Sequence, residues 1–215
     1  MSVTTAVPYF TARPAGPTEG RPGLVVVMEG NGMSQQLLRV CQRFAAEGFV
    51  VAAPDLFHRF GGSDADRAAS EGWYGKLRPE DGLADIAAAV AELRTLGVTS
   101  VGITGFCMGG LFSYLAATKG VDVDASVPFY GGRIGENLGE PSCPLLAFFG
   151  GSDPYIPTKQ IEAVIARHGD AVIVYDDADH GFMRDGSPSY HPTAAPDAWQ
   201  RALTFLHQNL DGNRG

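Results

Sequence analysis

Apolar residues along the chain form two alternating patterns, short continuous runs and longer helical repeats. Continuous runs are typical of strands buried on both faces of a sheet, and we predict strands at residues 24–28, 49–53, 99–104, 125–130, 145–149 and 171–175. Between them, apolar positions recur every three or four residues, which predicts amphipathic helices over residues 34–47, 83–96, 111–118, 159–167 and 197–210. This alternation predicts an α/β fold with a mostly parallel, doubly wound sheet and helices on both faces.

Two further segments lack these regular patterns. Residues 7–12 are expected to add an edge strand, whereas residues 55–82, rich in polar residues, are expected to form a long loop that is functional or mobile. We find no internal repeat, charge block or linker that would divide the 215 residues. The chain is therefore predicted to form one domain over residues 1–215, large enough to bury a sizeable core.

Charge and cysteine content exclude several classes of function. The net charge is −8 and basic residues do not cluster, so nucleic acid is not an expected partner. No apolar run reaches the roughly 20 residues needed to cross a bilayer, and residues 1–10 lack the features of a secretory signal. The cysteines, Cys41, Cys107 and Cys143, form no C-x-x-C pair, which argues against a disulfide framework or a zinc site. We therefore expect a cytoplasmic protein.

The sequence Gly-Phe-Cys-Met-Gly-Gly at residues 105–110 lies between a predicted strand and a predicted helix. It matches the G-x-S-x-G turn that presents a catalytic nucleophile, with Cys107 in the serine position. Such a sharp turn leaves no space for side chains at its flanking positions, which explains the glycines. A helix N-terminus also favours a thiolate. The simpler interpretation is a glycine-rich turn that carries a buried structural cysteine.

Three other candidate groups follow different predicted strands. Glu29, Asp153 and His180 each come shortly after an apolar run, and open α/β sheets bind ligands beyond the carboxyl ends of their strands. The order Cys107, Asp153, His180 is that of nucleophile, acid and base in α/β hydrolases. We expect His180 to take the thiol proton and Asp153 to orient its imidazole. Alternative acids closer to His180 in the sequence are Asp176, Asp177 and Asp179.

Backbone amides complete the predicted site. The amide of Met108 follows the nucleophile and that of Gly30 follows the first long strand, so both are candidate oxyanion donors. Residues 30–32, Gly-Asn-Gly, also match part of a dinucleotide-binding fingerprint, but its third glycine is replaced by Gln35. We reject a nicotinamide site on this basis and expect neither a cofactor nor a metal.

Several of these segments together resemble the dienelactone hydrolase family, small α/β hydrolases with a cysteine nucleophile. The matching segments are Glu29 and residues 53–59, 105–110, 151–157 and 180–184. The resemblance implies an α/β-hydrolase fold and a Cys107–His180–Asp153 triad that needs no metal or cofactor. It implies that Glu29 pairs with the thiol at rest, and that Arg59 and Arg184 bind the substrate carboxylate. Surface ion pairs are the alternative for both arginines.

The function predicted from the residues and the resemblance is hydrolysis of a small, anionic ester or lactone through a thioester. The expected partner is a small-molecule substrate, and the expected state a monomer or weak homodimer. Residues 30–32 are small where the family often carries bulky apolar residues, which predicts a wider or more flexible pocket. Two alternatives remain: a thioesterase or acyl transferase with the same triad, and a non-enzymatic redox or ligand-binding protein with Cys107 as a reactive thiol.

Overall fold

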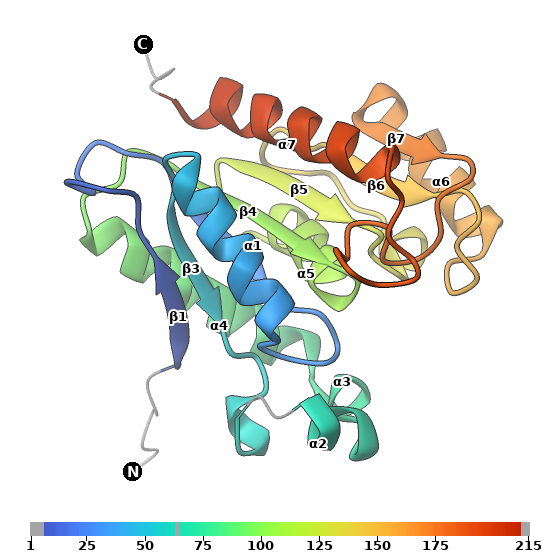
Figure 1. Cartoon of the computed structure of the whole chain (residues 1–215), viewed down its shortest axis with the longest axis horizontal. Helices are drawn as coiled ribbons and strands as arrows, with labels where there is room; N and C mark the ends of the chain where they lie inside the picture. Colours follow the sequence, from blue (N-terminus) through green and yellow to red (C-terminus); the bar gives the residue numbers. More distant parts are fainter. Residues whose placement is uncertain (1–6, 63–64, 212–215) are drawn as a thin grey trace.

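The computed structural model describes residues 7–62 and 65–211, so residues 1–6, 63–64 and 212–215 of the predicted domain lie outside the described residues. Within the described ranges, seven strands form one sheet in the order β1-β3-β2-β4-β5-β6-β7 (Figure 1). Only the edge strand β1 runs antiparallel to its neighbour. The strands are β1 (Tyr9–Ala12), β2 (Gly23–Val27), β3 (Val50–Pro54), β4 (Val101–Phe106), β5 (Ala125–Phe129), β6 (Ala147–Gly150) and β7 (Val172–Tyr175).

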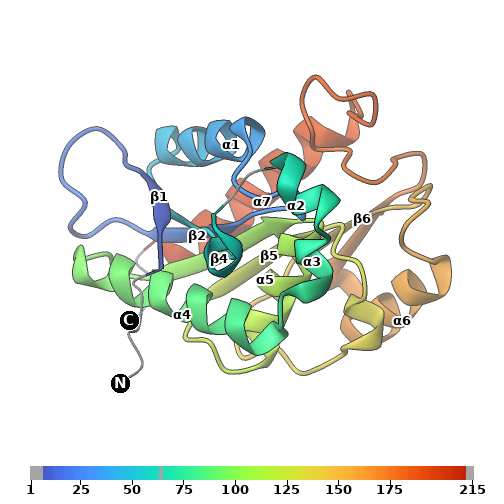
Figure 2. The same cartoon turned by 90° about the horizontal axis from the view of Figure 1, so that it is seen from below.

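Long helices cover both faces of this sheet. Figure 2 shows α1 and α7 on one side and α4, α5 and α6 on the other. These helices are α1 (Gln35–Ala46), α4 (Pro79–Thr95), α5 (Met108–Thr118), α6 (Thr158–His168) and α7 (Ala194–Leu210). Short 3₁₀ turns lie at η1 (His58–Phe60), η2 (Ile134–Glu136) and η3 (Gly169–Ala171). The predicted doubly wound α/β fold is thus confirmed.

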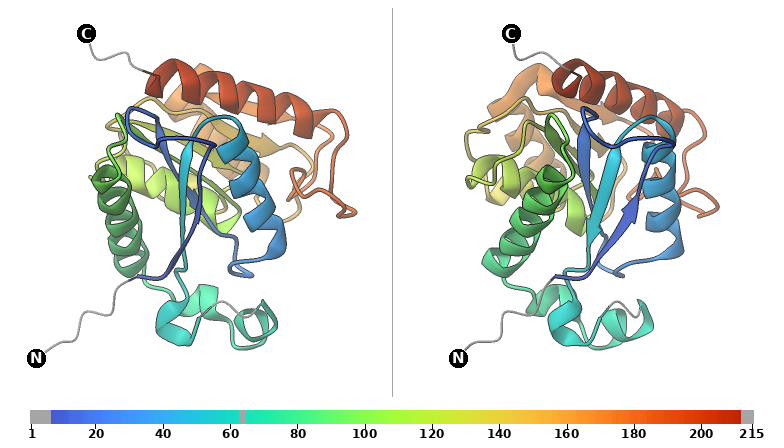
Figure 3. Two further views of the ribbon diagram at one scale, coloured as in Figure 1. Left: turned by 60° about the vertical axis from the view of Figure 1, so that its left-hand side comes forward. Right: turned by 90° about the vertical axis from the view of Figure 1, so that its left-hand side faces the viewer.

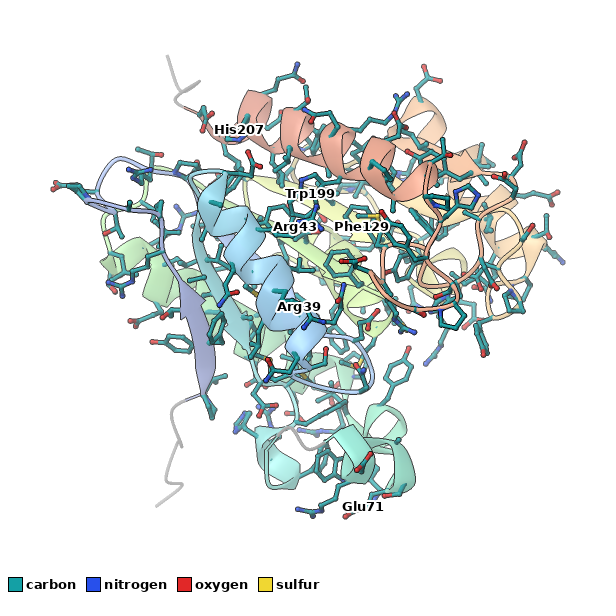
Figure 4. The ribbon with its side chains drawn as sticks, viewed as in Figure 1. Arg39, Arg43, Glu71, Phe129, Trp199 and His207 are labelled. Atoms are coloured by element: carbon teal, nitrogen blue, oxygen red, sulfur yellow. The ribbon has the colours of Figure 1, made fainter. Side chains whose placement is uncertain are left out.

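Burial on both faces explains the continuous apolar runs. Every residue of β2, β3, β4 and β5 is buried. On the α1 and α7 side, the ring of Trp199 lies 4.4 Å from that of Phe44, measured between centroids, and the guanidinium carbon of Arg43 lies 3.9 Å from the centre of the Trp199 ring (Figure 4). Aromatic and cation–π contacts of this kind fix the two helices against each other.

The expectation of a long loop over residues 55–82 is wrong. This segment contains two short helices, α2 (Ala65–Ser70) and α3 (Trp73–Lys76), beside the carboxyl end of β3 (Figure 3). The indole of Trp73 is buried against Phe57 and Phe60, with ring centroids 5.7 Å and 5.9 Å away. Helix α4 also begins earlier than predicted, because Pro79 suits a first helical position.

Candidate active site

The turn between β4 and α5 has the strained geometry that a nucleophile elbow requires. Cys107 has φ 55° and ψ −114°, a conformation that side chains rarely adopt. A Cβ atom at Gly105 would collide with the carbonyl group of Gly109, so hydrogen is the only side chain that fits there. This strained turn places Cys107, which is partly buried, directly before the first residue of α5.

His180 and Asp153 come together although 27 positions separate them. The Nδ1 atom of His180, which follows β7, lies 2.6 Å from Oδ2 of Asp153, which follows β6. The other oxygen of Asp153 accepts hydrogen bonds from the amides of Tyr155 at 2.8 Å and Ile156 at 3.2 Å. With its side chain fully buried, Asp153 is held in one orientation by these donors.

The alternative acids have other partners. Asp179 accepts a hydrogen bond from the backbone amide of His180 at 2.6 Å, and Asp177 lies 3.3 Å from Nε2 of His191. Asp176 contributes its carbonyl oxygen to the hydroxyl of Ser152. Of the four aspartates considered, Asp153 is therefore the one whose carboxylate faces the His180 ring.

The protonation of His180 reflects its two partners. Burial lowers the pKa of His180, but its hydrogen bonds to Asp153 and Cys107, together with their negative charges, outweigh burial and raise the pKa to about 9. The ring is therefore an imidazolium at neutral pH. A cation beside the sulfur stabilises a thiolate, which is the reactive form of cysteine.

Glu29 and Arg184 form an ion pair at the edge of this site. Glu29 is 6% exposed at the end of β2, and Nε of Arg184 donates to both carboxylate oxygens at 2.9 Å and 3.0 Å. Burial lowers the pKa of Arg184, but the charge of Glu29 and the hydrogen bond between the two side chains outweigh burial, so that the net pKa is raised. A buried carboxylate needs such a partner. Glu29 thus pairs with an arginine here, whereas the resemblance implies pairing with the thiol.

Tyr130 is a site residue that sequence reasoning missed. It has a positive φ of 35° and is fully enclosed directly after β5, with its ring 5.1 Å from that of His180 in an edge-to-face contact. Burial first, and then the charge of Glu29, raise its pKa well above the usual tyrosine value, which keeps the phenol neutral. The available signal was its position as the last residue of a predicted strand, directly before two glycines.

The two predicted oxyanion donors, Met108 and Gly30, lie in different surroundings. Met108 is the first residue of α5, so its amide has no acceptor within the helix. The amide of Cys107 itself is already bonded to the carbonyl of Phe129 at 3.1 Å. Gly30 lies beside Tyr74, since a Cβ on Gly30 would be 3.8 Å from atoms of Tyr74.

A cavity of about 450 Å³ opens above Cys107, a size that suits a small molecule. It is lined by Cys107, Met108, His180 and Arg184, all predicted, and by residues that were not predicted: Tyr74, Gly132, Arg133, Tyr155 and Ile156. Of these, Arg133 has a left-handed backbone with φ 66°. The cavity therefore places two arginines near the sulfur and the imidazolium.

Arg59 does not line this cavity, in contrast to its predicted role. Both terminal nitrogens of its guanidinium bind the carboxylate of Asp85, one of them at 2.7 Å and the other at shorter range. Asp85 is 2% exposed on α4, where a buried charge requires a partner. The structure therefore assigns Arg59 to an ion pair that ties η1 to α4.

Two classes of feature are absent from residues 7–62 and 65–211. In these ranges no helix combines the length and apolar character needed to cross a membrane. The same ranges hold no cluster of three or more His, Cys, Asp or Glu side chains that could bind a metal ion.

The sheet, the turn at Cys107 and the strand-end positions of Asp153 and His180 define an α/β hydrolase. The model of the Dienelactone hydrolase family matches residues 8–210, so this chain belongs to that family. Its membership confirms the predicted family and makes the protein a dienelactone hydrolase-like hydrolase of esters or lactones.

Named relatives agree with this assignment. The Escherichia coli protein named "Putative carboxymethylenebutenolidase" is 34% identical over 223 residues, covering 94% of this chain and 82% of that protein. A Synechocystis protein of the same name is 33% identical over 214 residues, covering 88% and 87%. The crystal structure of "Putative Dienelactone Hydrolase" from Klebsiella pneumoniae matches with a TM-score of 0.82 at 29% identity, covering 94% of this chain and 93% of that one.

Proposed function

We propose that the protein hydrolyses small esters or lactones carrying an anionic group, with Cys107 as nucleophile and a thioester as intermediate. The observation that supports this most directly is the position of His180, whose Nδ1 lies 2.6 Å from Asp153 and which lines the same cavity as Cys107. A nucleophile, a base and an acid that orients the base are the components of a catalytic triad.

In the first half of the reaction, the Cys107 thiolate attacks the substrate carbonyl carbon. The negative charge that develops on the carbonyl oxygen is stabilised by the amides of Met108 and Gly30. The intermediate collapses, the carbon–oxygen bond to the leaving group breaks, and the His180 imidazolium gives its proton to the departing alkoxide. The products of this half are an alcohol, or an enol in the case of an enol-lactone, and a thioester on Cys107.

In the second half, the neutral imidazole of His180 takes a proton from water as that water attacks the thioester carbonyl. The carbon–sulfur bond then breaks, which releases the acid and restores the thiolate beside the imidazolium. Asp153 keeps the ring oriented and stabilises its positive charge in both halves.

Arg184 is the proposed anchor for the anionic group of the substrate. Its Nε is bound to Glu29, while the residue also lines the cavity. A guanidinium can bind two carboxylates through different edges. Glu29 therefore fixes the arginine, and the terminal nitrogens are assigned to the substrate.

Turnover assays test this function. Activated esters, an enol-lactone and a thioester would be offered to the wild type and to Cys107→Ala and His180→Ala. We expect kcat/KM for an ester or lactone to fall about 10³-fold or more in both variants. Turnover of thioesters alone, or acyl transfer to an added acceptor in place of water, would favour a thioesterase or acyl transferase. Thiol labelling without any acyl turnover would favour a redox or ligand-binding protein.

The cysteines also bear on where the enzyme acts. All three are free, and free thiols are typical of a reducing compartment. This supports the proposal of a cytoplasmic enzyme that acts on a small-molecule substrate.

A further inference from the structure

A second cavity of about 400 Å³ lies next to the one at Cys107. The two cavities share two lining residues, Tyr74 from α3 and Arg133 from the segment after β5. Tyr74 lines the same cavity as Cys107. Burial first, and then the negative charge of Cys107, raise the pKa of its phenol. The second cavity therefore borders the proposed catalytic site at these two side chains.

The second cavity combines an apolar wall with cationic groups. Its wall is formed by Leu111, Phe112 and Leu115, three buried side chains on one side of α5. The segment opposite contributes Lys76 and Arg78. Arg78 is bound to Asp81 by two hydrogen bonds of 2.7 Å. Lys76, in contrast, forms no ion pair with the other described residues.

Arg133 stands at the junction of the two cavities, in a backbone conformation that is unfavourable for a residue with a side chain. Its φ of 66° is the left-handed region, where glycine is the usual residue, and it directly follows two glycines. Its Nε lies 3.2 Å from the carboxylate of Glu136, and both side chains are largely exposed. An exposed ion pair is weak, so this guanidinium is available to exchange Glu136 for another anion.

From this adjacency, the apolar wall and the cationic groups, we infer that the two cavities bind one elongated substrate. Its ester carbonyl lies at Cys107, and an apolar chain passes Tyr74 and Arg133 along α5 to end in an anionic group bound by Lys76, with Arg133 contributing its positive charge from the junction. This inference rests on the proposed function and extends it, because it assigns the chain length and the distal charge of the substrate.

Two glycines provide a matched pair of variants. A Cβ atom at Gly75, which lines the second cavity, or at Gly132, which lines the first, would meet no atom within 4 Å. Neither glycine has a positive φ. Gly75→Phe therefore fills the second cavity and Gly132→Phe fills the first without displacing the protein's own atoms at the point of attachment.

The test compares kcat/KM for a two-carbon ester and an eight-carbon ester, in one series with the chain on the acyl side and in another with the chain on the alcohol side. We expect Gly75→Phe to lower the ratio of long to short ester about tenfold in at least one series, a size typical of lost pocket contacts. Gly132→Phe is expected to lower both rates together. An unchanged ratio in both series for Gly75→Phe would overturn the inference.

A second experiment tests the binding of the substrate's distal anionic group and does not depend on whether Gly75→Phe folds. Two eight-carbon esters, with and without a terminal carboxylate, would be compared in Arg133→Gln and Lys76→Met. We expect the preference for the carboxylate form to fall about tenfold in Lys76→Met, and less in Arg133→Gln because Arg133 stands at the junction. An equal preference in wild type and both variants would contradict the distal anion site. Failure of the proposed function is separate, since it would appear as short-ester turnover that persists in Cys107→Ala.

Discussion

The carboxylate of Asp153 is held on both of its oxygens, one by His180 and the other by two backbone amides. Asp179 also contacts His180, but through the backbone amide of the histidine. The imidazole is thus oriented by Asp153 alone among these two acids. A carboxylate in this position fixes the tautomer of the ring and stabilises its charge.

Replacement of these two acids separates their roles. We expect Asp153→Asn to lower kcat for an ester about 10³- to 10⁴-fold, because the ring loses its orientation and its counter-charge. Asp179→Asn is the matched control and is expected to change kcat less than about tenfold. Circular dichroism spectra that match the wild type would confirm that both variants fold. Equal losses of kcat in two such folded variants would show that Asp153 does not orient His180 for catalysis.

The ion pair of Glu29 and Arg184 predicts a stability cost when either partner is removed alone. We expect Arg184→Met to lower the free energy of unfolding by about 2–3 kcal/mol, less than for a fully buried pair because the arginine is partly exposed. The double variant Glu29→Gln, Arg184→Met should recover part of this loss. Chemical denaturation of Arg184→Met, Glu29→Gln and the double variant measures these losses, and additive losses in the double variant would mean that the two side chains do not interact.

Arginines show where residue-level prediction from sequence succeeds and fails. The motifs placed Cys107, Asp153 and His180 at strand ends, where the topology brings them together. Arg59 and Arg184 are equivalent in sequence terms, since each is the last residue of a segment that matches the family. Of these two arginines only Arg184 lines the cavity. Arg59 instead forms an ion pair with Asp85, which is buried on α4. Such a buried partner, distant in sequence, cannot be read from local patterns.

Among the structural elements, the strands and long helices were predictable because the residues that they bury are apolar and recur with the spacing of a strand or a helix. The short helices α2 and α3 were not, since four to six residues carry no helical repeat. They are stabilised instead by Trp73, whose indole nitrogen donates to Glu71 at 3.0 Å and whose ring packs on Phe57. Tertiary contacts of one side chain thus convert an expected loop into an ordered wall of the cavity.

Trp73→Ala should loosen this wall without unfolding the sheet. The indole packs on Phe57 and Phe60 and belongs to the hydrophobic core, but it is carried by a four-residue helix outside the sheet, so we expect local opening rather than global loss. Amide hydrogen exchange should rise at least tenfold within residues 58–62 and 65–76, while the protection of β4 and β5 stays unchanged. KM should rise because Tyr74 loses its support. Equal deprotection of the sheet would show that this segment is an integral part of the main core.

For the whole molecule, the raised pKa of His180 predicts a loss of stability in mild alkali. The folded pKa is about 9 against an ordinary value of 6.5, so the contribution is fully present below pH 6.5 and is lost as the pH rises to about 9. We expect a loss of about 2 kcal/mol over this window, after allowance for partial solvent screening. Denaturation at a series of pH values measures it. His180→Gln is the control and should show a flatter profile; a wild-type profile that is equally flat would contradict the ion pair.

Formation of a thioester on Cys107 is the most direct measurement of the proposed mechanism. The protein would be mixed with an activated ester, quenched in acid at intervals, and its intact mass recorded together with product release. We predict a transient mass increase equal to the acyl group, mapped to Cys107 by peptide analysis and absent in Cys107→Ala. Product release without an adduct on Cys107, at a rate that Cys107→Ala leaves unchanged, would contradict covalent catalysis by this cysteine.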